Sequence, residues 1–170
     1  MMKLKALFPL LCASALSFNA SAACFADQFS QYTQAYKTWY SGVVELIVKQ
    51  HPELEAHAKR YLEVQSLTAD KNSIALAYVE ENHPQHLRKD RAINQWLDLT
   101  PELESELKDK SSEYVNILQQ LAQLKQAMGG QVDYKLRTEF ANLFTKSKDA
   151  EKLFSVYLDT VGKLEESSCK

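Results

Sequence analysis

Helix-breaking residues are scarce and widely separated in this sequence, and this scarcity limits the fold more than any other feature. After residue 22 the chain holds only three prolines, Pro52, Pro84 and Pro101, and four glycines, two of them adjacent at Gly129-Gly130. Each proline suits the first position of a helix, where its missing N–H costs nothing. Leu, Ala, Glu, Lys and Gln, which favour helices, are abundant. The sequence therefore predicts an all-α fold.

Aromatic residues recur at helical spacing in the first predicted helix, about residues 24–50. The apolar positions, mostly three or four residues apart, are Phe25, Phe29, Tyr32, Tyr36, Trp39, Tyr40, Val43 and Ile47. This pattern is typical of an amphipathic helix, and one interpretation is that the stripe forms core. However, a buried tyrosine hydroxyl needs a partner. Tyr32, Tyr36, Trp39 and Tyr40 are therefore also candidates for a face that binds a partner or an apolar ligand.

Four further segments follow. The second, residues 52–82, has a looser apolar pattern at 68–73, which predicts a break or a kink. We expect a short helix at 84–97 and a long one at 100–128, and residues 132–167 form either one helix or two that are separated at 145–149. No repeat or flexible linker appears. We therefore expect one domain, an antiparallel four-helix-bundle-like fold with one short extra helix.

The first 22 residues have the features of a secretory signal peptide. A lysine-containing start precedes an apolar run of 13 residues at 6–18, which is too short to span a membrane as a stable anchor. Ala20 and Ala22 stand at the −3 and −1 positions of a cleavage site. The sequence predicts cleavage after Ala22 or Ala23, a mature domain of residues 23–170, and a periplasmic or secreted location.

Removal of the signal peptide leaves two cysteines, Cys24 and Cys169, at opposite ends of the mature domain. In an oxidising compartment such a pair predicts one disulfide. The bond would link the N- and C-terminal helices and would require both ends to lie at one pole, as they do after an even number of antiparallel spans. Two free thiols or an intermolecular bond are the alternatives. Lipid attachment to Cys24 also stays open, although Ser21 occupies the position where a lipoprotein signal carries an apolar residue.

The charge of the mature domain excludes some partners. Removal of Lys3 and Lys5 leaves 18 basic against 22 acidic residues, so the net charge is about −4. Nucleic-acid binding is disfavoured, because it depends on neutralising phosphates with Lys and Arg. After residue 22 no apolar stretch is long enough to cross a membrane.

Motifs for metal binding and catalysis are weak or missing. Glu80 and His83 have the Glu-x-x-His spacing of di-iron bundles, and His86 is near, but such sites need a second copy, which the chain lacks. The sequence also lacks G-x-S-x-G, His-Glu-x-x-His, a glycine-rich phosphate loop and the C-x-x-C-H haem motif. We therefore expect no enzyme activity, cofactor or metal site, with Glu80, His83 and His86 as weak metal candidates.

These observations together predict an exported, non-catalytic helical protein that acts through protein–protein interaction. Its expected partner is another envelope or secreted protein, in the manner of an assembly factor, a chaperone or an immunity protein. The alternative is a carrier that holds a small apolar ligand or cofactor within the helical bundle.

Overall fold

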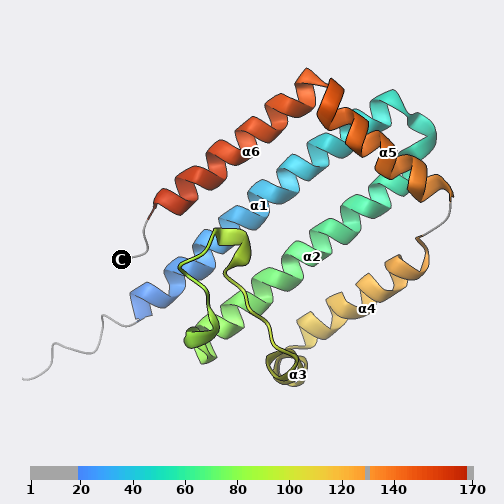
Figure 1. Cartoon of the computed structure of the whole chain (residues 1–170). Coiled ribbons are helices and arrows are strands. Elements are labelled where there is room, and N and C mark those ends of the chain that lie inside the picture. The colour runs from blue at the N-terminus through green and yellow to red at the C-terminus, as the bar shows by residue number, and fades with distance from the viewer. Residues whose placement is uncertain (1–18, 129–130, 168–170) are drawn as a thin grey trace, which may run out of the picture.

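The computed structural model describes residues 19–128 and 131–167. Within these ranges the chain is almost entirely helical and contains no strand (Figure 1), so the all-α prediction is confirmed. The α-helices are α1 (Asn19–Gln50), α2 (Glu55–Asn82), α3 (Pro101–Lys110), α4 (Ser112–Gln126), α5 (Gln131–Lys146) and α6 (Lys148–Glu166).

Four of the helices lie side by side in the order α6, α1, α2, α4, and each runs antiparallel to its neighbour (Figure 1). Helix α1 packs against both α2 and α6, and α2 packs against α4. The edge helices α4 and α6 do not pack against each other within the described residues, so the row is open rather than closed around a central core. Helix α5 crosses one end of the α1–α2 hairpin, and α3 lies at the other end. The antiparallel spans were predicted, but a closed bundle was not the right arrangement.

Helix α2 runs without interruption through residues 68–73, so of the two alternatives the break is wrong. The pattern loosens because polar residues of this stretch meet polar residues of α1. Asp70 forms an ion pair with Lys37, and the hydroxyls of Ser73 and Thr33 lie 3.1 Å apart. The polar residues of this stretch that face α1 therefore pair with α1, and they do not end α2.

Two serines end helices where the apolar pattern alone shows no boundary. Ser111 separates α3 from α4, so the predicted single helix at 100–128 is wrong, and its hydroxyl accepts a hydrogen bond from the N–H of Tyr114 at 3.1 Å. Ser147 separates α5 from α6 and caps α6 in the same way, through the N–H of Ala150 at 3.3 Å. Of the two alternatives for residues 132–167, two helices is correct. Serine favours such N-cap positions because its oxygen satisfies an N–H that has no partner in the helix.

The segment at 84–97 is not the predicted short helix. It contains two 3-10 turns, Pro84–His86 and Ile93–Gln95, and Leu87 and Leu97 pair in an isolated antiparallel bridge. Its buried side chains, Leu87, Ile93 and Trp96, pack against α1 and α2. The segment therefore covers one end of the helical row with its apolar residues. A short helix would place these residues on one narrow side and would cover less of that end.

The start of α1 and the end of α6 lie together. The side chain of Gln28, only 5% exposed, donates hydrogen bonds to the backbone carbonyls of Leu164 and, at 2.8 Å, of Ser167. Cys169 lies outside the described residues, so its disulfide with Cys24 stays a prediction. The position of Gln28 beside Ser167 meets the requirement of that prediction that both ends share one pole.

Residues 1–18, which carry most of the predicted signal peptide, also lie outside the described residues. In the part of the chain that is described, no helix combines the length and apolarity needed to cross a membrane.

Candidate binding surface

Nine aromatic side chains from four helices form one continuous cluster, here called the aromatic face. Its members are Tyr32, Tyr36, Trp39 and Tyr40 of α1, Tyr61 of α2, Phe140 and Phe144 of α5, and Phe154 and Tyr157 of α6. Each of the nine is half-buried or exposed. Water therefore reaches every member of the cluster, unlike an ordinary hydrophobic core.

Trp39 lies at the centre of the aromatic face. The centroid of its ring system is 5.1 Å from that of Tyr157, 5.8 Å from that of Phe154 and 5.9 Å from that of Phe144. These distances are typical of favourable aromatic pairs. Because Phe144 belongs to α5, and Phe154 and Tyr157 to α6, Trp39 holds the last two helices against α1.

Helical spacing explains how each helix contributes. Tyr36 and Tyr40 follow one another by one turn on α1, with ring centroids 5.9 Å apart. On α5, Phe140 reaches Tyr40 at 5.6 Å and Tyr61 at 6.5 Å, so it joins α2 to the cluster. Aromatic residues at helical spacing therefore occur in α5 and α6 as well as in α1. Those of α5 and α6 lie on the sides of these helices that pack against α1.

The aromatic face is polar at its hydroxyls but carries no charge. The Tyr36 hydroxyl donates to the side-chain oxygen of Gln65 at 2.7 Å, and the Tyr61 hydroxyl accepts from Arg137 at 3.1 Å. Burial raises the pKa of Tyr36 and that of Tyr40 above the usual value, and a neighbouring tyrosine raises each further. These hydroxyls therefore stay neutral at physiological pH.

A groove of about 350 Å³ between α1 and α6 adjoins the aromatic face. Among the residues that line it are Gln34, Thr38, Trp39, Leu153, Val156 and Tyr157. Val156 is 60% exposed, although it is fully apolar. The groove thus offers an uncharged, largely apolar surface with amide and hydroxyl groups along its α1 edge.

Exposed apolar side chains gather on the last two helices. In the described ranges, every large apolar side chain that is exposed belongs to α5 or α6: Val132, Tyr134, Phe144, Phe154, Val156 and Leu158. Helix α6 lies at the edge of the open row and packs mainly against α1, which leaves much of its surface uncovered. Phe144 and Phe154, whose ring centroids are 6.4 Å apart, form an exposed apolar pair, and exposed apolar patches are typical of a binding site for another molecule.

The weak metal candidates do not come together. Glu80 is buried, whereas the His83 ring lies 3.2 Å from a carboxylate oxygen of Glu106, and the rings of His83 and His86 are 6.2 Å apart. Glu106 also accepts a hydrogen bond from Tyr78, which raises the pKa of Tyr78 to about 12. Within the described residues no group of three or more metal-ligating side chains forms.

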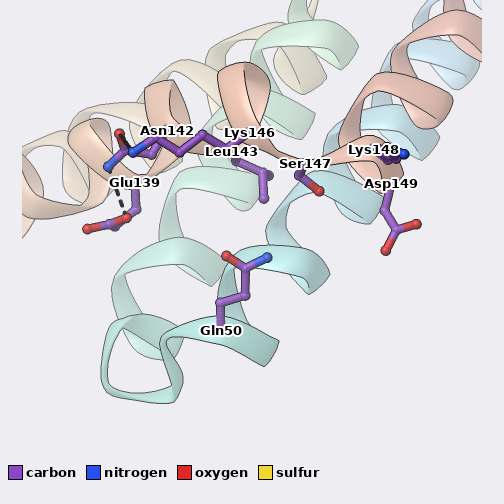
Figure 2. A pocket seen from close by; sticks show the side chains of 8 residues that line it. All are labelled: Gln50, Glu139, Asn142, Leu143, Lys146, Ser147, Lys148 and Asp149. Atoms are coloured by element: carbon purple, nitrogen blue, oxygen red, sulfur yellow. Dashed lines mark hydrogen bonds between the residues drawn. The ribbon is translucent and has the colours of Figure 1, made fainter.

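A pocket of about 450 Å³ lies where α5 meets α6, near the end of α1. Figure 2 shows Glu139 and Asn142 on α5, next to each other, and Lys148 and Asp149 on α6. Asn142 donates a hydrogen bond to Glu139 at 3.3 Å, and the Ser147 hydroxyl caps α6. The serine oxygen is thus engaged in capping rather than paired with a base, and the pocket carries charges of both signs.

Sequence reasoning identified the α1 part of the aromatic face and missed the rest. Phe140, Phe154 and Tyr157 of the last segment and Tyr61 of the second were not among the candidates. The signal that could have joined them is that aromatic residues recur every three or four positions in two segments that antiparallel packing brings together.

Comparison of the chain with protein-family models, with curated proteins and with solved structures finds no match.

Proposed function

We propose that the protein is an exported, non-catalytic helical protein that binds another envelope or secreted protein through the aromatic face and the adjoining side of α5 and α6. The observation that carries the proposal is the placement of the exposed apolar residues. Those of the described residues lie on α5 and α6, and two of them, Phe144 and Phe154, belong to the aromatic face.

The chemistry of this surface suits a protein partner. Cores of protein interfaces are rich in Tyr, Trp and Phe and poor in charge, and buried aromatic anchors supply much of the binding energy. Tyrosine hydroxyls such as those of Tyr36 and Tyr61 keep a polar group at the rim of an apolar contact. The partner we expect is therefore an apolar segment with free backbone or side-chain hydrogen-bonding groups.

A carrier of a small apolar ligand is the second candidate, and the groove beside Trp39 is the observation that favours it. A carrier usually buries most of its ligand. The row of helices is open between α4 and α6, and the groove lies on its surface, so a ligand there would stay largely exposed. A protein partner, which does not need an enclosed cavity, fits this open surface better.

The test is site-specific crosslinking in cells that export the protein. A photo-reactive amino acid at Val156, on the groove, is expected to give one discrete adduct with an envelope protein, because this side chain would lie inside the contact. The same group at Asn116, exposed on α4, is the control and should give no such adduct. Absence of an adduct at Val156, or the same adducts at both positions, would contradict the proposal.

Native mass spectrometry of the purified protein separates the two candidates. A mass equal to that of the polypeptide supports the interaction proposal, whereas a stoichiometric bound small molecule would favour the carrier.

A further inference from the structure

Glu80 is a buried carboxylate that the aromatic face does not use. It lies in the last turn of α2 and is only 6% exposed. Neither of its carboxylate oxygens accepts a well-aligned hydrogen bond among the described residues. Burying an unpaired carboxylate is costly, and an apolar side chain of similar size would avoid that cost. Packing alone therefore does not explain why glutamate occupies this position.

The Glu80 carboxylate lies against the start of α1. Burial is the largest effect on the Glu80 pKa and raises it, whereas the backbone N–H groups of Phe25 and Ala26 lower it. Lys89, whose ammonium group is 3.7 Å from the centroid of the Phe25 ring, lowers it too, and Asp27 raises it. The carboxylate thus lies within reach of two backbone N–H groups but accepts no well-aligned hydrogen bond from either.

Those two donors are engaged in the chain as it stands. Helix α1 begins before them, so the N–H groups of Phe25 and Ala26 donate to the carbonyls four residues earlier, those of Ser21 and Ala22. Cleavage of a signal peptide after Ala22 or after Ala23 would remove both carbonyls. Either cleavage site therefore leaves the same two N–H groups without acceptors in the helix.

We propose that Glu80 caps the first turn of mature α1 after signal-peptide removal, by accepting hydrogen bonds from the N–H groups of Phe25 and Ala26. This inference rests on the proposed export. Carboxylates are favoured at helix N-termini because the helix dipole is positive there, and the new α-ammonium group adds a positive charge within one turn. Cleavage thus removes the carbonyls that compete with the buried carboxylate for both N–H groups, and it stabilises the mature chain through Glu80.

The test compares two chains with defined starts, one at Ala23 and one at Asn19, which keeps the first turn of α1. In each, Glu80→Leu removes both acceptor oxygens, and Glu81→Leu, at the exposed neighbouring position, is the matched control. Amide hydrogen exchange at Phe25 and Ala26 is measured by NMR, and the melting temperature is recorded for every chain. Glu80→Gln, which keeps one acceptor oxygen, serves if the Leu variant folds poorly.

In the chain from Ala23, Glu80→Leu is expected to speed exchange at both amides by at least about tenfold, equivalent to about 1.4 kcal/mol, and to lower the melting temperature. In the chain from Asn19 the same substitution should leave exchange unchanged and raise the melting temperature, because it removes an unpaired buried charge. Glu81→Leu should affect neither amide in either chain.

Equal effects of Glu80→Leu in the two chains would overturn the inference about Glu80 and leave the proposed export intact. The mass of the protein recovered from cells tests the export separately. Retention of residues 1–22 in that protein would overturn the proposed export and, with it, the capping of α1 by Glu80 after cleavage.

Discussion

Replacement of Gln28 by alanine tests the contact that joins the two ends of the helical row. Gln28 is 5% exposed, and its side-chain nitrogen donates to two backbone carbonyls near the end of α6, those of Leu164 and Ser167. Carbonyls in the last turn of a helix lack N–H partners within that helix. Gln28, on α1, donates hydrogen bonds to such carbonyls at the end of α6. Gln28→Ala should therefore destabilise the protein.

The magnitude follows from the groups that lose partners. Each hydrogen bond contributes about 1 kcal/mol, and a buried group left unsatisfied costs about 1–3 kcal/mol. Leu164 keeps a second donor, the Ser167 hydroxyl at 2.7 Å, which limits its loss. We expect a decrease of about 2–3 kcal/mol in the free energy of unfolding, out of a total of about 5–15 kcal/mol. For a domain of this size the melting temperature should fall by about 5–10 °C.

Urea denaturation and thermal melting followed by circular dichroism measure both quantities, with all proteins in the same redox state. Gln31→Ala, at an exposed position one turn later on α1, is the control and should change stability by less than about 0.5 kcal/mol. If Gln28→Ala changes stability as little as this control does, the packing of the end of α6 on the start of α1 is not as described.

Three further predictions concern stability and covalent structure. The Tyr114 hydroxyl is fully buried and has no hydrogen-bond partner among the described residues, so Tyr114→Phe should raise the free energy of unfolding by about 1 kcal/mol; a loss in urea denaturation would mean that the hydroxyl is paired. A side chain added at Gly162 meets open space, whereas one at Gly42 meets a leucine methyl at 3.0 Å. Gly162→Ala should therefore gain about 0.5–1 kcal/mol in the same assay and Gly42→Ala less; the reverse order would contradict the packing of α6 on α1. Mass spectrometry of the exported protein should show a chain about two mass units lighter than its reduced form, from a bond between Cys24 and Cys169; an unchanged mass would leave both thiols free.

The helices themselves were largely predictable from the sequence, because proline and glycine are rare and apolar residues follow a helical period. The boundaries at Ser111 and Ser147 were harder to predict, since a single serine cap interrupts an apolar pattern that continues on both sides. The reverse error occurred in α2, where polar residues such as Asp70 weaken the pattern but pair with α1. Local periodicity does not distinguish a polar residue that ends a helix from one that meets a neighbour.

The open arrangement was not predictable from the sequence, since the apolar side of α6 has the same pattern whether one helix or two cover it. For the same reason, Tyr36 and Trp39 were recognised as candidates, but their aromatic neighbours on α5 and α6 were not. Whether a side chain is half-buried depends on which of its sides are covered by neighbouring helices. Only the three-dimensional arrangement gives that information.

An affinity measurement tests whether the aromatic face and the adjoining groove bind a protein partner. The partner captured through Val156 would be titrated against the wild-type protein and two variants, Val156→Asp and Ser155→Asp, which introduce the same charge on α6 at adjacent positions. Val156 lines the groove, whereas Ser155 is exposed and outside it. We expect Val156→Asp to weaken binding at least about tenfold, a loss of about 1.4 kcal/mol, and Ser155→Asp to change it less than about twofold. Equal affinities of the two variants for the partner would contradict the proposed binding site.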